Sequence, residues 1–244
     1  MSGFLSVFKR ELRGYFSTPL AYVFLMIFLF FSGFLTFQKN FFEMRQASMW
    51  LFFDSMPLLF IFLVPAMAMR LWAEERRSNS IELLFTLPIT VKQAVFGKFL
   101  ACWGVLALAL ALTWPMVATV NYLGNPDWGT IWTGYLGSFL LAGSYLAIGS
   151  FFSSLTRNQV IAFVLGVVAC AAFLYAGSPT VMNYLAGFLP AAFVESIESL
   201  SFRSRFESFQ RGVVEWRDIA FFVLLTTGWL WANVVALKER KAVG

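Results

Sequence analysis

The densest run of ionisable side chains in this sequence lies between residues 70 and 92. Its charged members after Arg70 are Glu74, Glu75, Arg76, Arg77, Glu82 and Lys92. An apolar run follows and ends at a proline; it consists of Leu83, Leu84, Phe85, Leu87 and Pro88. An apolar patch flanked by charge, outside a membrane, is a surface on which another protein can dock. The alternative is a solvated turn whose arginines anchor the adjoining helices. The spacing alone leaves both interpretations open.

The residue types needed for catalysis are missing or scattered. The chain has no His, so neither a Ser/His/Asp nor a Cys/His arrangement can form. Cys102 and Cys170 both lie in apolar runs, where a cysteine packs as a small hydrophobe. Carboxylates and thiols do not cluster as metal ligands would. The one Gly-Lys pair, Gly97-Lys98, is followed by Phe99 and therefore does not form a phosphate-binding loop. We expect no catalytic residue, metal or cofactor on this chain.

Composition indicates that lipid is the main solvent of this chain. Of its 244 residues, 59% are hydrophobic and 13% are charged, and it contains 30 Phe and 9 Trp. A soluble domain carries roughly 25% charged residues. The net charge of +5 does not indicate nucleic acid, because the cations gather beside apolar runs and anchor helices there. We predict an all-α integral membrane protein.

Six apolar runs are long enough to be transmembrane helices, at about 20 residues a span. They cover about 20–37, 49–72, 93–122, 131–152, 160–176 and 218–237, and form one transmembrane domain over 20–237. The longest connections are 73–92 and 177–217, and a short tail, 238–244, ends the chain. The middles of the third, fourth and fifth spans carry no ionisable side chain, which argues against a proton-driven carrier and an intramembrane protease. A passive channel stays possible on these grounds.

The distribution of Lys and Arg predicts the orientation. Twelve of the 18 fall in segments on the side of the termini: Lys9, Arg10, Arg13, Arg70, Arg76, Arg77, Lys92, Lys98, Arg157, Lys238, Arg240 and Lys241. The other six lie on the opposite side: Lys39, Arg45, Arg203, Arg205, Arg211 and Arg217. Positive charge accumulates on the cytoplasmic side, so we expect both termini in the cytoplasm, 73–92 as a cytoplasmic segment and 177–217 as an extracytoplasmic one.

Residues 1–19 are predicted to form an amphipathic helix in the membrane interface. At 100° per residue, the apolar side chains fall on a narrow arc; they are Phe4, Leu5, Phe8, Leu12, Tyr15 and Phe16. Lys9, Arg10 and Arg13 lie on another arc, whereas Glu11 lies near the apolar edge. In the fourth span, Gly134, Ser138 and Ala142 share one face, which allows either dimerisation or close packing within one subunit.

The segment from Arg70 to Ile89 resembles the signature segment of ABC-2 type permeases, the membrane subunits of many ATP-binding-cassette exporters. Further similarity lies at 17–19, 63–70, 97–100, 123–126, 145–159 and 211–218. Together these segments cover nearly the whole chain and are most similar to the gliding-motility-associated branch of that family. Asn79 stands where the family commonly has Gly, which affects local turn geometry only.

The resemblance implies partners that composition does not show. Two permease subunits would pair, as a homodimer or with a related chain, and two cytosolic ATPase subunits would bind ATP and Mg beneath them. Residues 2–18 would be the interfacial connecting helix, 74–90 would include the helix that couples to the ATPase, and 177–217 would hold short extracytoplasmic helices. An accessory subunit with an extracytoplasmic domain is also typical of this branch.

We therefore expect a permease of an ATP-driven exporter or extruder in the bacterial inner membrane, which has no enzymatic activity by itself. One alternative is a passive channel, or a scaffold that assembles a membrane complex. Another is a small membrane-embedded enzyme, against which the missing catalytic residues count. If the segment 74–90 docks a partner, its buried apolar residues should matter more than an exposed rim charge such as Glu75.

Overall fold

The computed structural model of the chain describes residues 3–39, 41, 47–78, 89–187 and 197–243, except the side chains of 179, 185, 186 and 240–243. Helices and no strands occur in this part of the chain, which confirms the all-α class. The helices are α1 (Gly3–Ser17), α2 (Pro19–Gln38), α3 (Trp50–Ala68), α4 (Arg70–Arg77), α6 (Val91–Ala111), α7 (Trp114–Leu123), α8 (Trp128–Leu155), α9 (Gln159–Tyr175), α10 (Pro179–Ala186), α12 (Phe202–Gln210) and α13 (Trp216–Val243).

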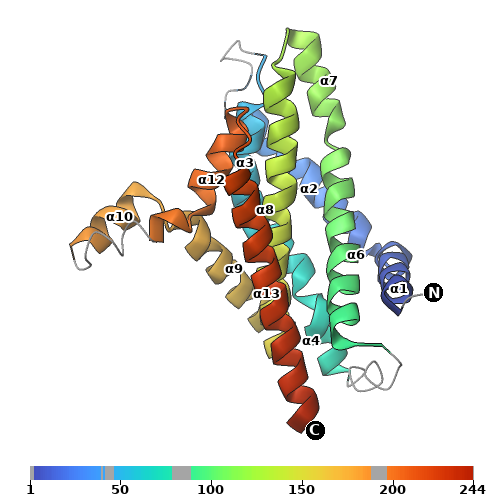
Figure 1. Cartoon of the computed structure of the whole chain (residues 1–244). Helices are drawn as coiled ribbons and strands as arrows, with labels where there is room; N and C mark the ends of the chain where they lie inside the picture. Colours follow the sequence, from blue (N-terminus) through green and yellow to red (C-terminus); the bar gives the residue numbers. More distant parts are fainter. Residues whose placement is uncertain (1–2, 40, 42–46, 79–88, 188–196, 244) are drawn as a thin grey trace.

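Helix α8 is the central element of the bundle. It packs against α3, α4, α6, α9, α12 and α13, whereas α2 lies outside α3 and α1 lies against α6. Figure 1 shows α6, α8 and α13 running side by side, with α7 continuing α6 at one end of the bundle. Helix α4 lies at the opposite end. Both chain termini lie toward the α4 end.

Small residues let neighbouring helices approach α8 closely. A Cβ built on Gly134 would lie 2.4 Å from the Phe53 ring of α3, and one on Gly149 would lie 2.6 Å from the Ala68 Cβ. Ser138 and Ala142 are fully buried. The small-residue face of the fourth predicted span is therefore used for packing within one subunit.

Five helical stretches are long and apolar enough to cross a membrane. They are Pro19–Gln38, Trp50–Arg77, Val91–Leu123, Trp128–Leu155 and Trp216–Glu239. They correspond to the first four predicted spans and the last. The fifth predicted span is α9, an apolar helix of 17 residues. At 1.5 Å per residue it is about 25 Å long, at the short end of the range for a span. A sixth crossing stays a prediction.

The ends of the long helices are set by capping side chains. Thr90 and Gln93 form a reciprocal capping box at the start of α6. The Asp127 carboxylate accepts a hydrogen bond from the Gly129 N–H at the start of α8, and the Asn158 side chain accepts one from the Val160 N–H at the start of α9. These caps place the helix starts two or three residues before the predicted spans in α6 and α8.

In the described part of the segment 177–217, two short helices, α10 and α12, are placed differently relative to the bundle. Helix α10 points away from the bundle (Figure 1), whereas α12 is attached through Phe202, Phe206 and Phe209, each at most 1% exposed. Asp218, 1% exposed at the start of α13, pairs with Arg205 of α12 at 3.1 Å. The helical spacing of Phe193, Val194, Ile197 and Leu200 also predicts a short amphipathic helix at the outer interface. Only Ile197 and Leu200 are among the described residues, so this helix stays a prediction.

Candidate functional site: the junction of α1, α4 and α6

Helix α4 begins where the long third helix breaks, and a serine of α8 holds this break in place. The Ser153 hydroxyl donates a hydrogen bond to the Met69 carbonyl at 2.8 Å. It also accepts hydrogen bonds from the Trp72 and Ala73 N–H groups, both at 3.1 Å. The first N–H groups of a helix have no partner within that helix. Ser153 therefore acts as a cap supplied by another helix, and it fixes α4 against α8.

Trp72 extends this attachment to α13. Its side chain is fully buried, and its indole N–H donates to the Ser150 hydroxyl at 3.2 Å. The same hydroxyl accepts a hydrogen bond from the Asn233 amide of α13 at 2.7 Å. Buried polar side chains joined in this way fix the relative positions of the helices that carry them. Three helices, α4, α8 and α13, therefore meet at Ser150.

Lys98 is the charged centre of the junction. Its ammonium group, on α6, lies 2.9 Å from the Glu75 carboxylate of α4 and 3.2 Å from the Glu11 carboxylate of α1. Only 4% of the Lys98 side chain is exposed, and the ammonium lies 5.3 Å from the centre of the Trp72 ring. A buried ammonium requires opposite charge nearby. Lys98 has two such partners, one on each neighbouring helix.

The fourth member of this charged cluster is Arg10. Its guanidinium lies 2.8 Å from Glu11 and 3.9 Å from Glu75, and half of the side chain is exposed. Burial by itself raises the pKa of the Glu11 carboxyl, but Lys98 and Arg10 outweigh burial, so that pKa lies below its ordinary value. The cluster of Arg10, Glu11, Glu75 and Lys98 therefore combines two basic with two acidic side chains.

A cavity of about 310 Å³ lies beside the cluster, between α1 and α4. Glu11, Arg70, Glu74 and Lys98 are among its lining residues. No group of three or more His, Cys, Asp or Glu side chains suited to a metal ion occurs in the part of the chain that the structure describes. The geometry is that of a structural junction, in which ion pairs attach α1 and α4 to α6.

The structure divides the four adjacent charges predicted at 74–77. Glu75 and Arg76 point inward: Glu75 contacts Lys98, and the Arg76 guanidinium donates to the Ser154 carbonyl. Glu74 and Arg77 are exposed. The expectation that Glu75 is a rim charge is wrong, because only 20% of its side chain is exposed and Lys98 holds it. The remaining predicted coupling residues, Glu82, Leu83, Leu84, Phe85, Leu87 and Pro88, lie outside the described residues.

The side of α1 that contacts α6 coincides only in part with the apolar arc predicted from the sequence. Val7 is the buried residue of this helix, and a Cβ on Gly97 would lie 2.9 Å from it. Leu12, Tyr15 and Phe16 pack against the core, whereas Phe4 and Phe8 stack on each other at 6.4 Å. The position of Glu11 at the apolar edge is explained by Lys98. The interfacial placement of α1 stays a prediction.

The residues of this junction that the sequence did not single out are Lys98, Ser150, Ser153, Trp72 and Asn233. One signal could have identified Lys98, namely a cation eight residues into an apolar helix that begins at Val91. The two serines carried no comparable signal, because serine is also common as a small packing residue in membrane helices.

The sequence profile of the ABC-2 family transporter proteins matches residues 37–235. This match covers most of the chain and includes α3, α4, α6, α8 and most of α13. The chain belongs to the ABC-2 transporter family. A search of curated proteins gave no significant match. As an ABC-2 family protein, the chain is a multi-pass membrane subunit of an ABC transporter, a transport component that works with an ATP-binding partner and is not an enzyme by itself.

Proposed function

We propose that this chain is the permease of an ATP-driven exporter or extruder in a bacterial inner membrane. In this proposal the chain crosses the membrane six times, with both termini in the cytoplasm. It pairs with a second copy or a related permease, and two cytosolic ATPase subunits bind ATP and Mg beneath the pair. An accessory subunit with an extracytoplasmic domain belongs to the assembly of the gliding-motility-associated branch.

The observation that supports ATPase coupling through 73–92 is the attachment of α4 at three places. Glu75 joins it to α1 and α6 through Lys98, Ser153 joins it to α8, and Trp72 joins it to α13 through Ser150. A displacement of this segment therefore moves several helices together. ATP binding favours the closed ATPase pair, and the permease conformation that fits the closed pair becomes the populated one.

Co-purification with the ATPase tests the docking part of this proposal. Leu84→Ala and Phe85→Ala remove apolar anchors, and each is expected to weaken the complex by about 2 kcal/mol or more. Glu82→Ala weakens it further if that carboxylate pairs with a buried cation of the ATPase. Glu74→Ala is the matched control, since 57% of the Glu74 side chain is exposed and an exposed charge contributes under about 1 kcal/mol.

ATP turnover in reconstituted complexes tests the transmission part. Glu75→Gln leaves the exposed surface of α4 intact but removes its charge pair with Lys98. We expect this variant to bind the ATPase normally while substrate-linked turnover falls. Normal assembly and turnover in Leu84→Ala, Phe85→Ala and Glu82→Ala together would show that 73–92 is only a connector. A chain that purifies without any ATPase and still supports flux would instead be a passive channel.

A further inference from the structure

Two neighbouring cavities lie at the end of the bundle opposite to α4. The first, of about 250 Å³, is enclosed by the end of α2, the start of α3, the end of α9 and α12. The second, of about 240 Å³, lies between the start of α3 and Thr130 near the start of α8. Trp50 and Gln210 line both. We call the two cavities together the α12 cavity.

Gln210 is the unusual polar residue of the α12 cavity. Its side chain is carried by the last residue of α12, and the residue is only 8% exposed. Its amide has no hydrogen-bond partner among the described residues. A primary amide offers two donor hydrogens and one acceptor oxygen. The Gln210 amide lines both cavities and is not among the fully buried unpaired groups, so it is accessible from the cavity and can hydrogen-bond to a polar group that enters there.

The charges of the lining leave one cation available. Lys39, just after α2, pairs with Asp54 of α3 at 2.6 Å, and Glu207 of α12 pairs with Arg211, just after that helix. Arg203 is exposed and has no ion pair among the described residues. The lining therefore offers one cation, Arg203, that has no ion pair among the described residues, close to a hydrogen-bonding amide. Such a combination suits an oxyanion, which accepts from both groups.

Three of the other lining residues are large, apolar or aromatic, and exposed. Trp50, Leu58 and Tyr175 are 46%, 45% and 43% exposed. Tryptophan and tyrosine are common where membrane meets water. A cavity of about 250 Å³ accommodates a polar head, whereas drug-sized pockets span roughly 300–1,000 Å³. Long hydrocarbon chains therefore remain outside, along Leu58 and Tyr175.

We propose that the α12 cavity binds the headgroup of an anionic membrane phospholipid. The phosphate lies at Arg203, the Gln210 amide donates to a headgroup oxygen, and the acyl chains lie against the exposed apolar side chains of α3 and α9. This site is separate from the α1–α4–α6 junction and requires no ATPase. The lipid-binding proposal can therefore be tested independently of the coupling mechanism.

Lipid binding to the purified chain in detergent tests this site. The probes are dioleoylphosphatidylglycerol, dioleoylphosphatidylcholine as the zwitterionic comparison, and sn-glycerol 3-phosphate as a headgroup without chains. Native mass spectrometry counts bound lipid, and the thermal midpoint reports stabilisation. We expect one phosphatidylglycerol to bind per chain, in preference to phosphatidylcholine, and glycerol phosphate to bind far more weakly.

Three variants locate the binding. Arg203→Gln removes one cation near a headgroup and lowers phosphatidylglycerol affinity about fivefold. Gln210→Leu lowers it by a similar factor while leaving the stability of the lipid-free protein largely unchanged, since the amide makes no hydrogen bond with the described residues. Arg217→Gln, a matched loss of charge at an exposed position near this end, leaves affinity unchanged.

Several results would overturn the proposal. One is unchanged phosphatidylglycerol affinity in both Arg203→Gln and Gln210→Leu. Another is equal binding of the two lipids, which would remove the role of the anion. A third is equally tight binding of glycerol phosphate, which would make the site one for a soluble anion.

Discussion

Among single side chains, Lys98 has the greatest influence on how the helices of this protein are joined. Its ammonium is buried, yet it is within 3.2 Å of carboxylates from two other helices. Moving a charge into an apolar region is costly unless it is paired. The two carboxylates therefore offset the cost of burying the Lys98 charge. In turn, Lys98 fixes α1 and α4 beside α6.

Lys98→Met should strongly destabilise the protein. It leaves Glu11 and Glu75 close together without their shared cation, and breaking a buried pair in this way costs about 3–5 kcal/mol. For a chain of this size the midpoint of thermal unfolding falls by roughly 10 °C. Thermal unfolding in detergent measures this shift, and Lys92→Met, which removes an exposed cation from the same helix, serves as the control.

Adding Glu11→Gln and Glu75→Gln to Lys98→Met should recover part of the lost stability, because no unpaired charge then remains in the junction. Apolar or neutral groups often replace a buried ion pair at little net cost. If the triple variant is less stable than Lys98→Met alone, repulsion between the two carboxylates is not the cause of the loss.

The lowered pKa of Glu11 predicts a dependence on pH. A carboxyl whose pKa is lower in the folded protein adds stability above its ordinary pKa, and that contribution disappears as the pH falls through the lowered value. Glu11→Gln should therefore reduce the unfolding midpoint throughout pH 5–8. The difference from the natural protein should shrink once the pH drops below about 4. A difference that stays constant into acid would contradict this assignment.

At the scale of elements, the position of α8 depends on small side chains along its length. Gly134, Gly143 and Gly149 each contact a neighbouring helix: the Phe53 ring, the Trp103 ring and the Ala68 methyl, respectively. In lipid, where burial of apolar surface drives little association between helices, close packing supplies much of the attraction. Larger residues on α8 would separate it from α3 and α6.

Gly149→Ala should be destabilising although alanine favours helix. Its Cβ would lie 2.6 Å from the Ala68 Cβ and 3.5 Å from the Pro65 Cα, and overpacking of this kind costs about 1–3 kcal/mol. Gly228→Ala on α13 is the matched control, because nothing lies within 4 Å of its Cβ. Gains of about 0.5–1 kcal/mol are typical for that change in a helix. Similar midpoints for the two variants would argue against tight packing of α8 on α3.

The elements were largely predictable because long apolar runs have few alternatives in a membrane. The fourth predicted span, 131–152, lies within α8, whose start is set by Asp127. The junction was predictable only in part. Charge density drew attention to Glu75 and Arg76, but nothing local pairs Glu75 with Lys98 or the α4 backbone with Ser153. Those pairings depend on how helices distant in sequence pack, which hydrophobic periodicity does not specify.

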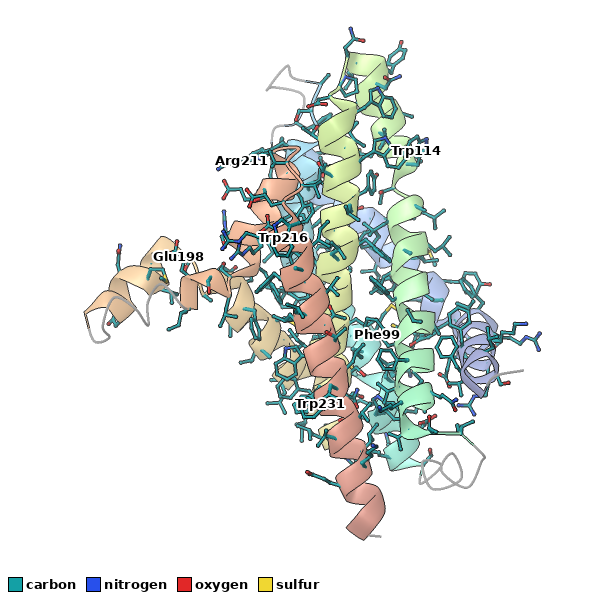
Figure 2. The ribbon with its side chains drawn as sticks, viewed as in Figure 1. Phe99, Trp114, Glu198, Arg211, Trp216 and Trp231 are labelled. Carbon is teal, nitrogen blue, oxygen red and sulfur yellow. The ribbon has the colours of Figure 1, made fainter. Side chains whose placement is uncertain are left out.

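At the scale of the whole molecule, the polar features separate into two ends. The charged junction and both termini lie toward one end, and the α12 cavity lies at the other. Figure 2 shows Arg211 and Trp216 in the α12 region, away from Trp231 farther along α13. This arrangement agrees with an even number of crossings and with the excess of Lys and Arg on the side of the termini.

Cysteine labelling in intact cells tests the orientation. Arg211→Cys should react with an impermeant maleimide from outside, whereas Arg77→Cys should react only after the membrane is opened. Cys102 and Cys170 are both buried, so they contribute little background. Labelling of Arg77→Cys in intact cells would reverse the orientation and place the α4 end outside.

The pairing of Glu11 with Lys98 also has a consequence for biogenesis. Glu11 leaves the ribosome before Lys98, by roughly 4–17 s at 5–20 residues per second. The amphipathic helix is therefore complete, and two spans have emerged, before the segment that carries the lysine reaches the translocon. A lysine at depth in a lone helix disfavours insertion. Glu11 on the early helix is already present as a counter-charge when Lys98 is inserted. Removing this helix should therefore lower the yield of correctly inserted chains. It should also lower the stability of the chains that do insert.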